Sequence, residues 1–277
     1  MMTQFPKYVF PWVVLLAAGV SSAATVVVDT CGQEVANRDQ GVLAGDLDCS
    51  GTSSPAVVLG RRAALDLAGF TLTGGNFDAV YCARNCIVTG GTLAGAGRNC
   101  VRAADGTATL TGMLLNGCGG GARFPAAVEG RSLIISTSTV LSTVGSALWA
   151  QKKLSMSSSS VDGCGWVGVH AQRKVKITDS TVADCEFGVS SSRVKLRSSS
   201  VTDYGCLGIT GGRLRAIDST VSNSTPGSGS CAAGGGSLDI STARRPRLVD
   251  STCERSHDFS SDPLYVDLPS WDVCSLD

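Results

Sequence analysis

Short runs in which apolar and polar residues alternate recur along most of this chain. In Val175-Lys176-Ile177 and Val194-Lys195-Leu196, two apolar side chains flank a charged one. This alternation predicts a β-strand with one buried face. Gly, Ser, Asn and Asp interrupt the runs after a few residues, so the runs are too short for helices. The pattern therefore predicts an all-β protein made of many short strands.

The strands repeat with a period of about 20 residues. Gly168, Gly188 and Gly208 lie 20 residues apart, and each is followed by Val or Ile. A Ser/Thr-Val pair closes the units: Thr139-Val140, Ser160-Val161, Thr181-Val182, Ser200-Val201 and Thr220-Val221. One unit buries little apolar surface, so stability must come from stacking like positions on like positions. We expect a single-domain right-handed parallel β-helix, a three-faced solenoid in which Ser159, Ser180, Ser199 and Ser219 form a ladder.

Composition supports a narrow core. The chain has 34 Gly and only 5% aromatic residues, which argues against a wide globular core, while its Ala, Val and Leu content argues against disorder. The formal net charge is zero. The whole molecule therefore has no net charge to steer a partner, and only local charge asymmetry remains.

The N-terminal 24 residues resemble a secretory signal peptide, with Lys7, an apolar stretch and small residues before a cleavage point. An uncleaved membrane anchor is the alternative. We expect an N-terminal cap over 25–56, β-helix repeats over 57–253 and a C-terminal cap over 254–277. The mature chain has no other segment long and apolar enough to span a membrane, so we expect a secreted, periplasmic or cell-surface protein.

All 12 cysteines follow the predicted signal peptide. An even number behind an export signal predicts disulfides. Zinc is the competing hypothesis for Cys82-x-x-x-Cys86, although that pair lacks a matching second pair. We expect Cys31 and Cys49 to staple the N-terminal cap and Cys253 and Cys274 the C-terminal cap. Sequence alone does not fix the connectivity.

The opening of the chain carries a family resemblance. Cys31-Gly32, the segment Gly45-Asp46-Leu47-Asp48-Cys49 and the later Leu65-Asp66-Leu67-x-Gly69-x-Thr71-Leu72-x-Gly74 resemble bacterial exported right-handed β-helix repeat proteins. These are similar in architecture to pectate lyases and the wider pectin-lyase-like superfamily. The resemblance implies the fold but no single activity, because that superfamily includes lyases, hydrolases, epimerases, phage tailspikes and non-catalytic proteins.

Cations recur at the repeat period. Stacking places Lys152, Arg173, Arg193 and Arg213 in one predicted column and Lys176, Lys195 and Arg215 in another. Like charges one coil apart, at about 4.8 Å, repel each other by roughly 1 kcal/mol per pair in water. Such columns indicate an anionic partner, a polysaccharide or another cell-envelope polymer. The alternative is a solvated face on which Lys and Arg only prevent aggregation.

Trp149 and His170 occupy one repeat position, close to Arg173 in sequence. An exposed Trp suits stacking on a sugar ring, and His170 and Arg173 are the candidate catalytic residues. The alternative is a Trp that covers the sheet beside a solvated His. If the protein is a lyase, the resemblance also implies calcium, but two carboxylates, Asp184 and Asp203, make a marginal site. We otherwise expect no metal or cofactor.

Three functional hypotheses follow. The first is an exported β-helix that binds polysaccharide or another anionic polymer without catalysis. The second is a polysaccharide lyase or epimerase that acts on uronate polymers, and the third is a structural or adhesive surface protein. The coils between Ser155 and Arg213 have no long insertions that would wall off a substrate cleft. This favours the first hypothesis and leaves open whether the protein is an enzyme. We expect no nucleic-acid partner, and the oligomeric state is open.

Overall fold

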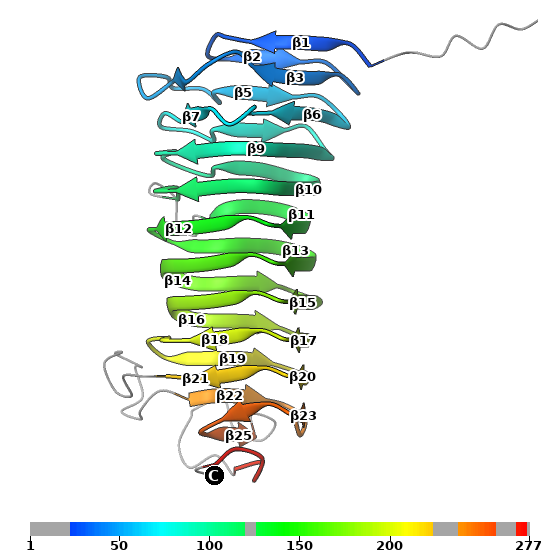
Figure 1. Ribbon diagram of the computed structural model, residues 1–277, viewed down its shortest axis with the longest axis vertical. Helices are drawn as coiled ribbons and strands as arrows, with labels where there is room; N and C mark the ends of the chain where they lie inside the picture. Colours follow the sequence, from blue (N-terminus) through cyan, green and yellow to red (C-terminus); the bar gives the residue numbers. More distant parts are fainter. Residues whose placement is uncertain (1–22, 120–125, 224–237, 259–269, 276–277) are drawn as a thin grey trace, which may run out of the picture.

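The protein is a parallel β-solenoid whose coils stack along one long axis (Figure 1). The structure, a computed structural model, describes residues 23–119, 126–223, 238–258 and 270–275. These residues contain strands and no helix, and every strand pair is parallel. The predicted all-β solenoid is thus confirmed. The predicted signal peptide lies almost wholly outside the described residues.

Strand pairing sorts the strands into three faces. The first face contains β1 (Thr25–Val28), β3 (Gln40–Leu43), β6 (Ala63–Asp66), β15 (Lys174–Thr178), β17 (Val194–Arg197), β20 (Leu214–Ile217) and β23 (Arg247–Val249). The same face includes parts of four longer strands, β9 (Cys86–Ala94), β10 (Val101–Asn116), β11 (Ala126–Ser136) and β13 (Ser146–Ser157). These long strands continue around an edge of the solenoid onto a neighbouring face.

The second face contains β4 (Leu47–Asp48), β7 (Thr71–Thr73), β12 (Thr139–Thr143), β18 (Ser200–Thr202), β21 (Thr220–Ser222), β24 (Thr252–Cys253) and the starts of β14 (Ser160–Ala171) and β16 (Thr181–Ser191). The third face contains β2 (Gln33–Val35), β5 (Val57–Leu59), β8 (Val80–Cys82), β19 (Leu207–Gly211), β22 (Leu238–Thr242) and β25 (Ser256–Asp258). The strands β1 to β4 already pair with later coils, so coil stacking begins inside the range expected for the N-terminal cap.

The core is a set of interior rows in which each apolar side chain packs on its counterpart in the next coil. One row on the first face runs through Leu65, Val88, Leu110, Ile135, Met156, Ile177, Leu196 and Ala216. Every member is at most 2% exposed. Because like stacks on like, a regular repeat fills a narrow interior without large aromatic residues.

The repeating glycines lie where the coils approach too closely for a side chain. A Cβ atom on Gly188 would lie 2.5 Å from the carbonyl oxygen of Gly208, and one on Gly168 would lie 2.8 Å from that of Gly188. Both distances are shorter than van der Waals contact. The step of 20 residues between these glycines therefore records a close backbone approach repeated in each coil.

A serine ladder closes the edge between the first and second faces, as predicted. The backbone N–H of Ser159 donates to Ser180 Oγ at 3.1 Å, and Ser180 Oγ donates to the carbonyl of Thr178 at 2.7 Å. The pattern repeats along the edge at Ser138, Ser199, Ser219 and Ser251. The residue before each ladder serine has a φ between 46° and 49°, a left-handed turn that aims the hydroxyl into the ladder.

Disulfides fasten the solenoid at both ends and between coils. The predicted pairs Cys31–Cys49 and Cys253–Cys274 are both present. Cys82 and Cys86, the zinc candidates, are bonded to each other. Two further disulfides, Cys100–Cys118 and Cys164–Cys185, complete the described pairs, and Cys206 is disulfide-bonded as well.

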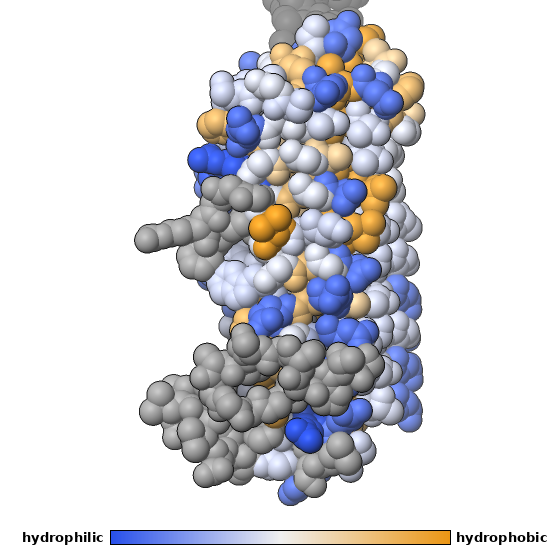
Figure 2. Space-filling view, turned by 90° about the vertical axis from the view of Figure 1, so that its left-hand side faces the viewer, coloured by the Kyte–Doolittle hydropathy of each residue, from blue (hydrophilic) through white to orange (hydrophobic). Residues whose placement is uncertain are grey.

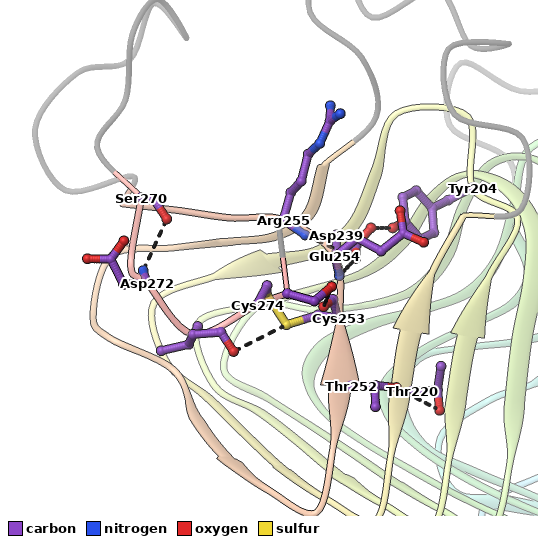
Figure 3. Close-up of a disulfide and its surroundings, with 12 residues drawn as sticks. Tyr204, Thr220, Asp239, Thr252, Cys253, Glu254, Arg255, Ser270, Asp272 and Cys274 are labelled. Carbon is purple, nitrogen blue, oxygen red and sulfur yellow. Dashed lines mark hydrogen bonds between the residues drawn. A yellow bond between two sulfur atoms is a disulfide. The ribbon is translucent and has the colours of Figure 1, made fainter. Parts of the chain in front are cut away.

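The Cys253–Cys274 disulfide lies beside a buried polar anchor at the C-terminal end (Figure 3). The Tyr204 hydroxyl donates to one oxygen of Asp239, and the backbone N–H of Glu254 donates to the other. Burial raises the pKa of Asp239. The anchor links successive coils at the C-terminal end of the solenoid. The Ser275 backbone N–H donates to the Cys253 carbonyl at 3.0 Å, so the tail lies against the last coil.

The ladder makes a stability prediction. Changing Ser180 to Ala removes the acceptor of the buried Ser159 N–H, so the free energy of unfolding should fall by about 1–3 kcal/mol. Urea unfolding followed by circular dichroism measures the change. The matched control is Ser155→Ala, because Ser155 lies on the outer side of the first face. Equal losses in the two variants would show that the ladder hydrogen bond is not the cause.

Candidate functional site

The outer side of the first face carries a ladder of four cations. Strand register aligns Lys176 with Lys195, Lys195 with Arg215, and Arg215 with Arg247. All four side chains are exposed. Sequence analysis placed the first three in one column, and the structure adds Arg247.

The second expected column differs in its register. The Arg173 backbone N–H donates to the Lys152 carbonyl at 3.1 Å, so these two residues lie in adjacent coils as expected. Val175 aligns with Val194, however, which places Arg193 beside Lys174 instead of Arg173. The reason is a turn that is one residue shorter: three residues separate Ala171 from Val175, but only two separate Ser191 from Val194. Arg213 then follows Arg193.

These residues belong to a longer row of cations at the turns between the third and first faces, which we call the cationic edge. Every described turn of this edge except one carries Lys or Arg. The row consists of Arg38, Arg61, Arg62, Arg84, Arg131, Lys152, Arg173, Arg193, Arg213, Arg244 and Arg245. The exception is the turn that contains Asp105 and Gly106. The cationic edge thus extends far beyond the four residues that the sequence indicated.

Acidic residues gather on the other side of the solenoid. Many of the described carboxylates lie on the second face or at its two edges: Asp46, Asp48, Asp66, Asp162, Asp179, Asp184, Glu186, Asp203, Asp218, Asp250 and Glu254. The second face is opposite the cationic edge in a three-faced solenoid. A chain with a formal net charge of zero is therefore polarised across its width.

The cations of the edge have few acidic neighbours. No described carboxylate oxygen lies within 4.0 Å of their side-chain nitrogens; the two described ion pairs both belong to Arg102, on the third face. The pKa of Lys152 is lowered, mainly by the positive charge of Arg131, then by slight desolvation and by the charge of Arg173. The edge is thus a row of cations that repel one another, and an anion beside it would relieve that repulsion.

Trp149 and His170 stack on one another on the third face. Their ring centroids lie 3.9 Å apart with an interplanar angle of 20°, and Trp166 adds a second ring at 6.5 Å from Trp149. The register aligns the two residues in adjacent coils. Because the rings stack along the solenoid axis, His170 covers one face of the Trp149 ring that a sugar would need for stacking.

Burial is the cause of the pKa shift of His170. Burial lowers the pKa of His170, and no charged group contributes to the shift. Arg173 lies in the turn after β14. The structure therefore places the two candidate catalytic residues on one coil but shows no electrostatic coupling between them.

The row that contains Trp149 continues into residues that sequence analysis missed. In successive coils it runs through Tyr81, Arg102, Glu129, Trp149 and His170, all half-buried. The signal was present in the sequence, because each of these residues follows Val or Leu at the start of a unit. An alignment of the earlier units on Leu148-Trp149 would have found it.

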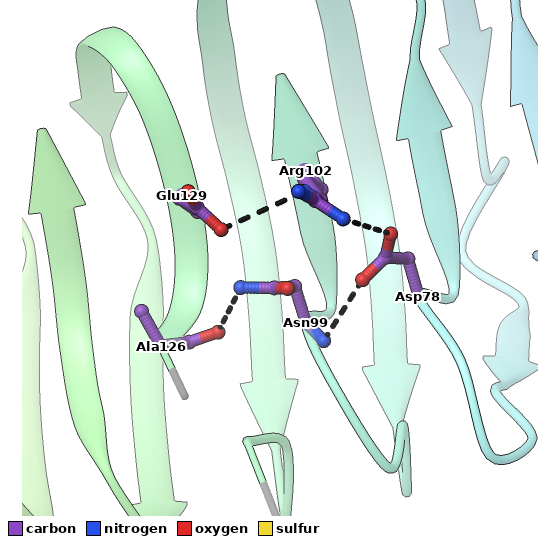
Figure 4. A network of polar contacts seen from close by, with 5 residues as sticks. All are labelled: Asp78, Asn99, Arg102, Ala126 and Glu129. Carbon is purple, nitrogen blue, oxygen red and sulfur yellow. Dashed lines mark hydrogen bonds and ion pairs between the residues drawn. The ribbon is translucent and has the colours of Figure 1, made fainter. Parts of the chain in front are cut away.

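Arg102 is the centre of a polar network in this row (Figure 4). Its Nη1 lies 4.0 Å from Asp78 Oδ2, and its Nε lies 3.6 Å from Glu129 Oε2. Asn99 links the same coils, since its backbone N–H donates to Asp78 at 3.2 Å and its Nδ2 donates to the Ala126 carbonyl at 2.6 Å. Burial raises the pKa of Asp78. The network joins three coils where strand β11 begins.

Two hollows lie at the edges of the solenoid. One, of about 340 Å³, is at the cationic edge and is lined by Arg61, Arg62, Arg84, Asn85, Asp105, Gly106, Thr107, Arg131 and Ser132. The other, of about 360 Å³, follows the serine ladder and is lined by hydroxyl groups and Asp179. Both are polar, and the described residues contain no group of three or more potential metal ligands.

The exposed apolar residues are scattered. The large described ones are Val27, Phe70, Ile87, Leu114, Ile134, Val144 and Val249. Four of them lie on strands of the first face, Val27, Ile87, Ile134 and Val249, and strand pairing places none of these four side by side in adjacent coils. The side shown in Figure 2 is hydrophilic over most of its described surface, with small separate apolar patches. Such a surface suits a polar partner better than an apolar one. Among the described residues, no helix is long and apolar enough to cross a membrane.

Comparison with known proteins gives one structural neighbour. No family model and no curated protein matches the sequence. The chain is similar in structure to the Dettilon tailspike protein, with 14% sequence identity and a TM-score of 0.46. The match covers 84% of this chain and 53% of that chain, so this chain spans about half the length of its neighbour.

The stack of Trp149 on His170 makes stability depend on pH. The pKa of His170 is lower in the folded state than the usual unfolded value of about 6.5. The unfolded state therefore binds more protons, and the free energy of unfolding should fall as the pH drops from 7.5 through 6.5 to 5.5. Urea unfolding across this range measures the slope. The slope should be smaller in His170→Gln, and an unchanged slope in that variant would contradict the assignment.

Proposed function

We propose that this chain is an exported β-helix protein of the bacterial pectin-lyase-like kind that binds a polysaccharide or another anionic polymer without catalysis. The binding surface is the cation ladder of the first face together with the adjoining cationic edge. The export signal, the disulfides and the polar surface support a location outside the cytoplasm: secreted, periplasmic or at the cell surface. No cofactor is needed for this function.

The observation that carries the proposal is the ladder Lys176, Lys195, Arg215 and Arg247. Adjacent coils place the backbones of these residues about 4.8 Å apart, and like charges at that spacing repel each other by roughly 1 kcal/mol per neighbouring pair in water. The carboxylates that could offset the repulsion lie mainly around the second face. A linear polyanion along the solenoid axis would place an opposite charge beside each coil, and the rigid spacing would preorganise the site.

Binding is better supported than catalysis. His170 is stacked beneath Trp149 and its pKa is lowered by burial alone. Arg173 belongs to the row of solvated cations at the edge. The two described hollows are polar, and the coils between Ser155 and Arg213 have short turns. These features support a surface that holds a polymer more than a site that performs elimination or epimerisation on it.

The binding proposal predicts the effect of removing charge from the ladder. Changing Lys195 and Arg215 to Gln should weaken binding of polygalacturonate by about 1–2 kcal/mol, which is roughly 5- to 30-fold, because exposed ion pairs contribute up to about 1 kcal/mol each. Raising NaCl from 50 to 300 mM should weaken binding of the unchanged protein. Isothermal titration calorimetry measures both effects, with neutral dextran as the uncharged polymer.

The matched control is the double change Arg98→Gln and Arg255→Gln, which removes two positive charges far from the ladder. An equal loss of affinity in the control would show that polygalacturonate responds to the net charge of the protein and not to the ladder. Absorbance at 235 nm is recorded in the same mixtures, since a new unsaturated uronate absorbs there. A rise that requires Arg173 would identify a lyase and overturn the non-catalytic proposal.

A further inference from the structure

The hollow at the cationic edge lies where the row of cations is interrupted. Arg84 and Arg131 belong to turns two coils apart, and the turn between them carries Asp105 and Gly106. The missing cation leaves a space of about 340 Å³ with guanidinium groups around it. This space is separate from the ladder of Lys176, Lys195, Arg215 and Arg247.

Local backbone packing creates the hollow. The register of β10 against β11 shifts between Ala103 and Thr107. Gly106 lies so close to the coil before it that an added Cβ would lie 1.7 Å from the Arg84 carbonyl oxygen. The Thr107 backbone N–H donates to Asn85 Oδ1 at 2.9 Å. The turn meets the coil before it through Gly106, which has no side chain, and the hydrogen bond from Thr107 to Asn85 holds the turn beside the hollow.

The lining of the hollow has a positive net charge that matches a dianion. Arg61, Arg62, Arg84 and Arg131 supply four positive charges and Asp105 one negative charge, which gives 4 − 1 = +3. No described carboxylate lies within 4.0 Å of these guanidinium groups. Guanidinium forks match the oxygen geometry of a phosphate group and stay charged at every physiological pH.

The remaining lining groups suit a sugar. Asn85, Asp105, Thr107 and Ser132 offer amide, carboxylate and hydroxyl groups that can exchange hydrogen bonds with sugar hydroxyls. The volume is at the lower end of the usual range for ligand sites, about 300–1,000 Å³. It is suited to one substituted sugar residue.

We infer that this hollow is a binding site for a sugar phosphate, a phosphate monoester whose dianion lies among the arginines while the sugar hydroxyls meet Asp105 and Asn85. The site lies within the cationic edge, but none of its lining residues belongs to the ladder of Lys176, Lys195, Arg215 and Arg247. A phosphate-bearing residue of a polymer and a free sugar phosphate share this chemistry.

The test uses glucose 6-phosphate as the probe in isothermal titration calorimetry with the full chain at 50 mM NaCl. We expect binding that weakens at least about tenfold in the double variant Arg62→Gln and Arg84→Gln, because charge-assisted hydrogen bonds are lost. The matched control, Arg98→Gln with Arg255→Gln, removes the same charge outside both the cationic edge and the ladder and should bind the probe as the unchanged protein does. Circular dichroism checks that each variant is folded.

Four results would overturn the inference. If the control loses as much affinity as the pocket variant, the probe responds to overall charge. If glucose 6-sulfate binds as tightly as glucose 6-phosphate, the charge match to a dianion is wrong, and if inorganic phosphate binds as tightly, the sugar takes no part. Absence of binding also refutes the site. Polygalacturonate binding by the ladder is measured separately, so the two proposals fail independently.

Discussion

The structure depends on the hydrogen bonds between parallel coils. They fix neighbouring coils about 4.8 Å apart, so every outward or inward side chain meets its counterpart in the next coil. Identical neighbours are favourable for some residues and unfavourable for others. Serines gain, because Ser180 accepts from Ser159 and donates to its own coil. Aliphatic residues gain by filling the interior, and glycines such as Gly188 are required where two backbones meet.

The same constraint makes charge placement informative. Alternating opposite charges along a row would be stabilising, as cross-strand pairs are, and the chain does this at Arg102 and Glu129. On the first face it instead repeats cations through Lys176, Lys195 and Arg215. Solvent screening keeps the cost modest, but the separation of cations from the acidic second face brings no benefit to folding. The proposed partner of opposite charge would offset the repulsion among these cations.

Sequence alone predicted the features that follow from strict periodicity. The strands, the serine ladder and the ladder Lys176–Lys195–Arg215 come from residues that keep the repeat spacing. The two cap disulfides were predicted differently, from the even number of cysteines and from their positions near the ends of the repeats. Sequence analysis failed where the spacing changes, because a turn one residue shorter moved Arg193 beside Lys174. It also missed Arg102 and Glu129, although each follows a Val at the start of a unit. The hollow could not be predicted from the sequence, because it depends on a close backbone contact at Gly106 and not on a residue that recurs in each repeat.

A solenoid with short turns cannot readily enclose a substrate, but its coils present outward side chains at a regular spacing along one axis. Each exposed cation contributes weakly by itself, whereas several at fixed spacing act together on one polymer, since the second contact forms at high effective concentration. Affinity then comes from the number of coils engaged instead of from any single residue. The short turns between Ser155 and Arg213 therefore favour the proposed polymer binding over catalysis, whereas the hollow at the turn of Asp105 and Gly106 is suited to a different, smaller ligand.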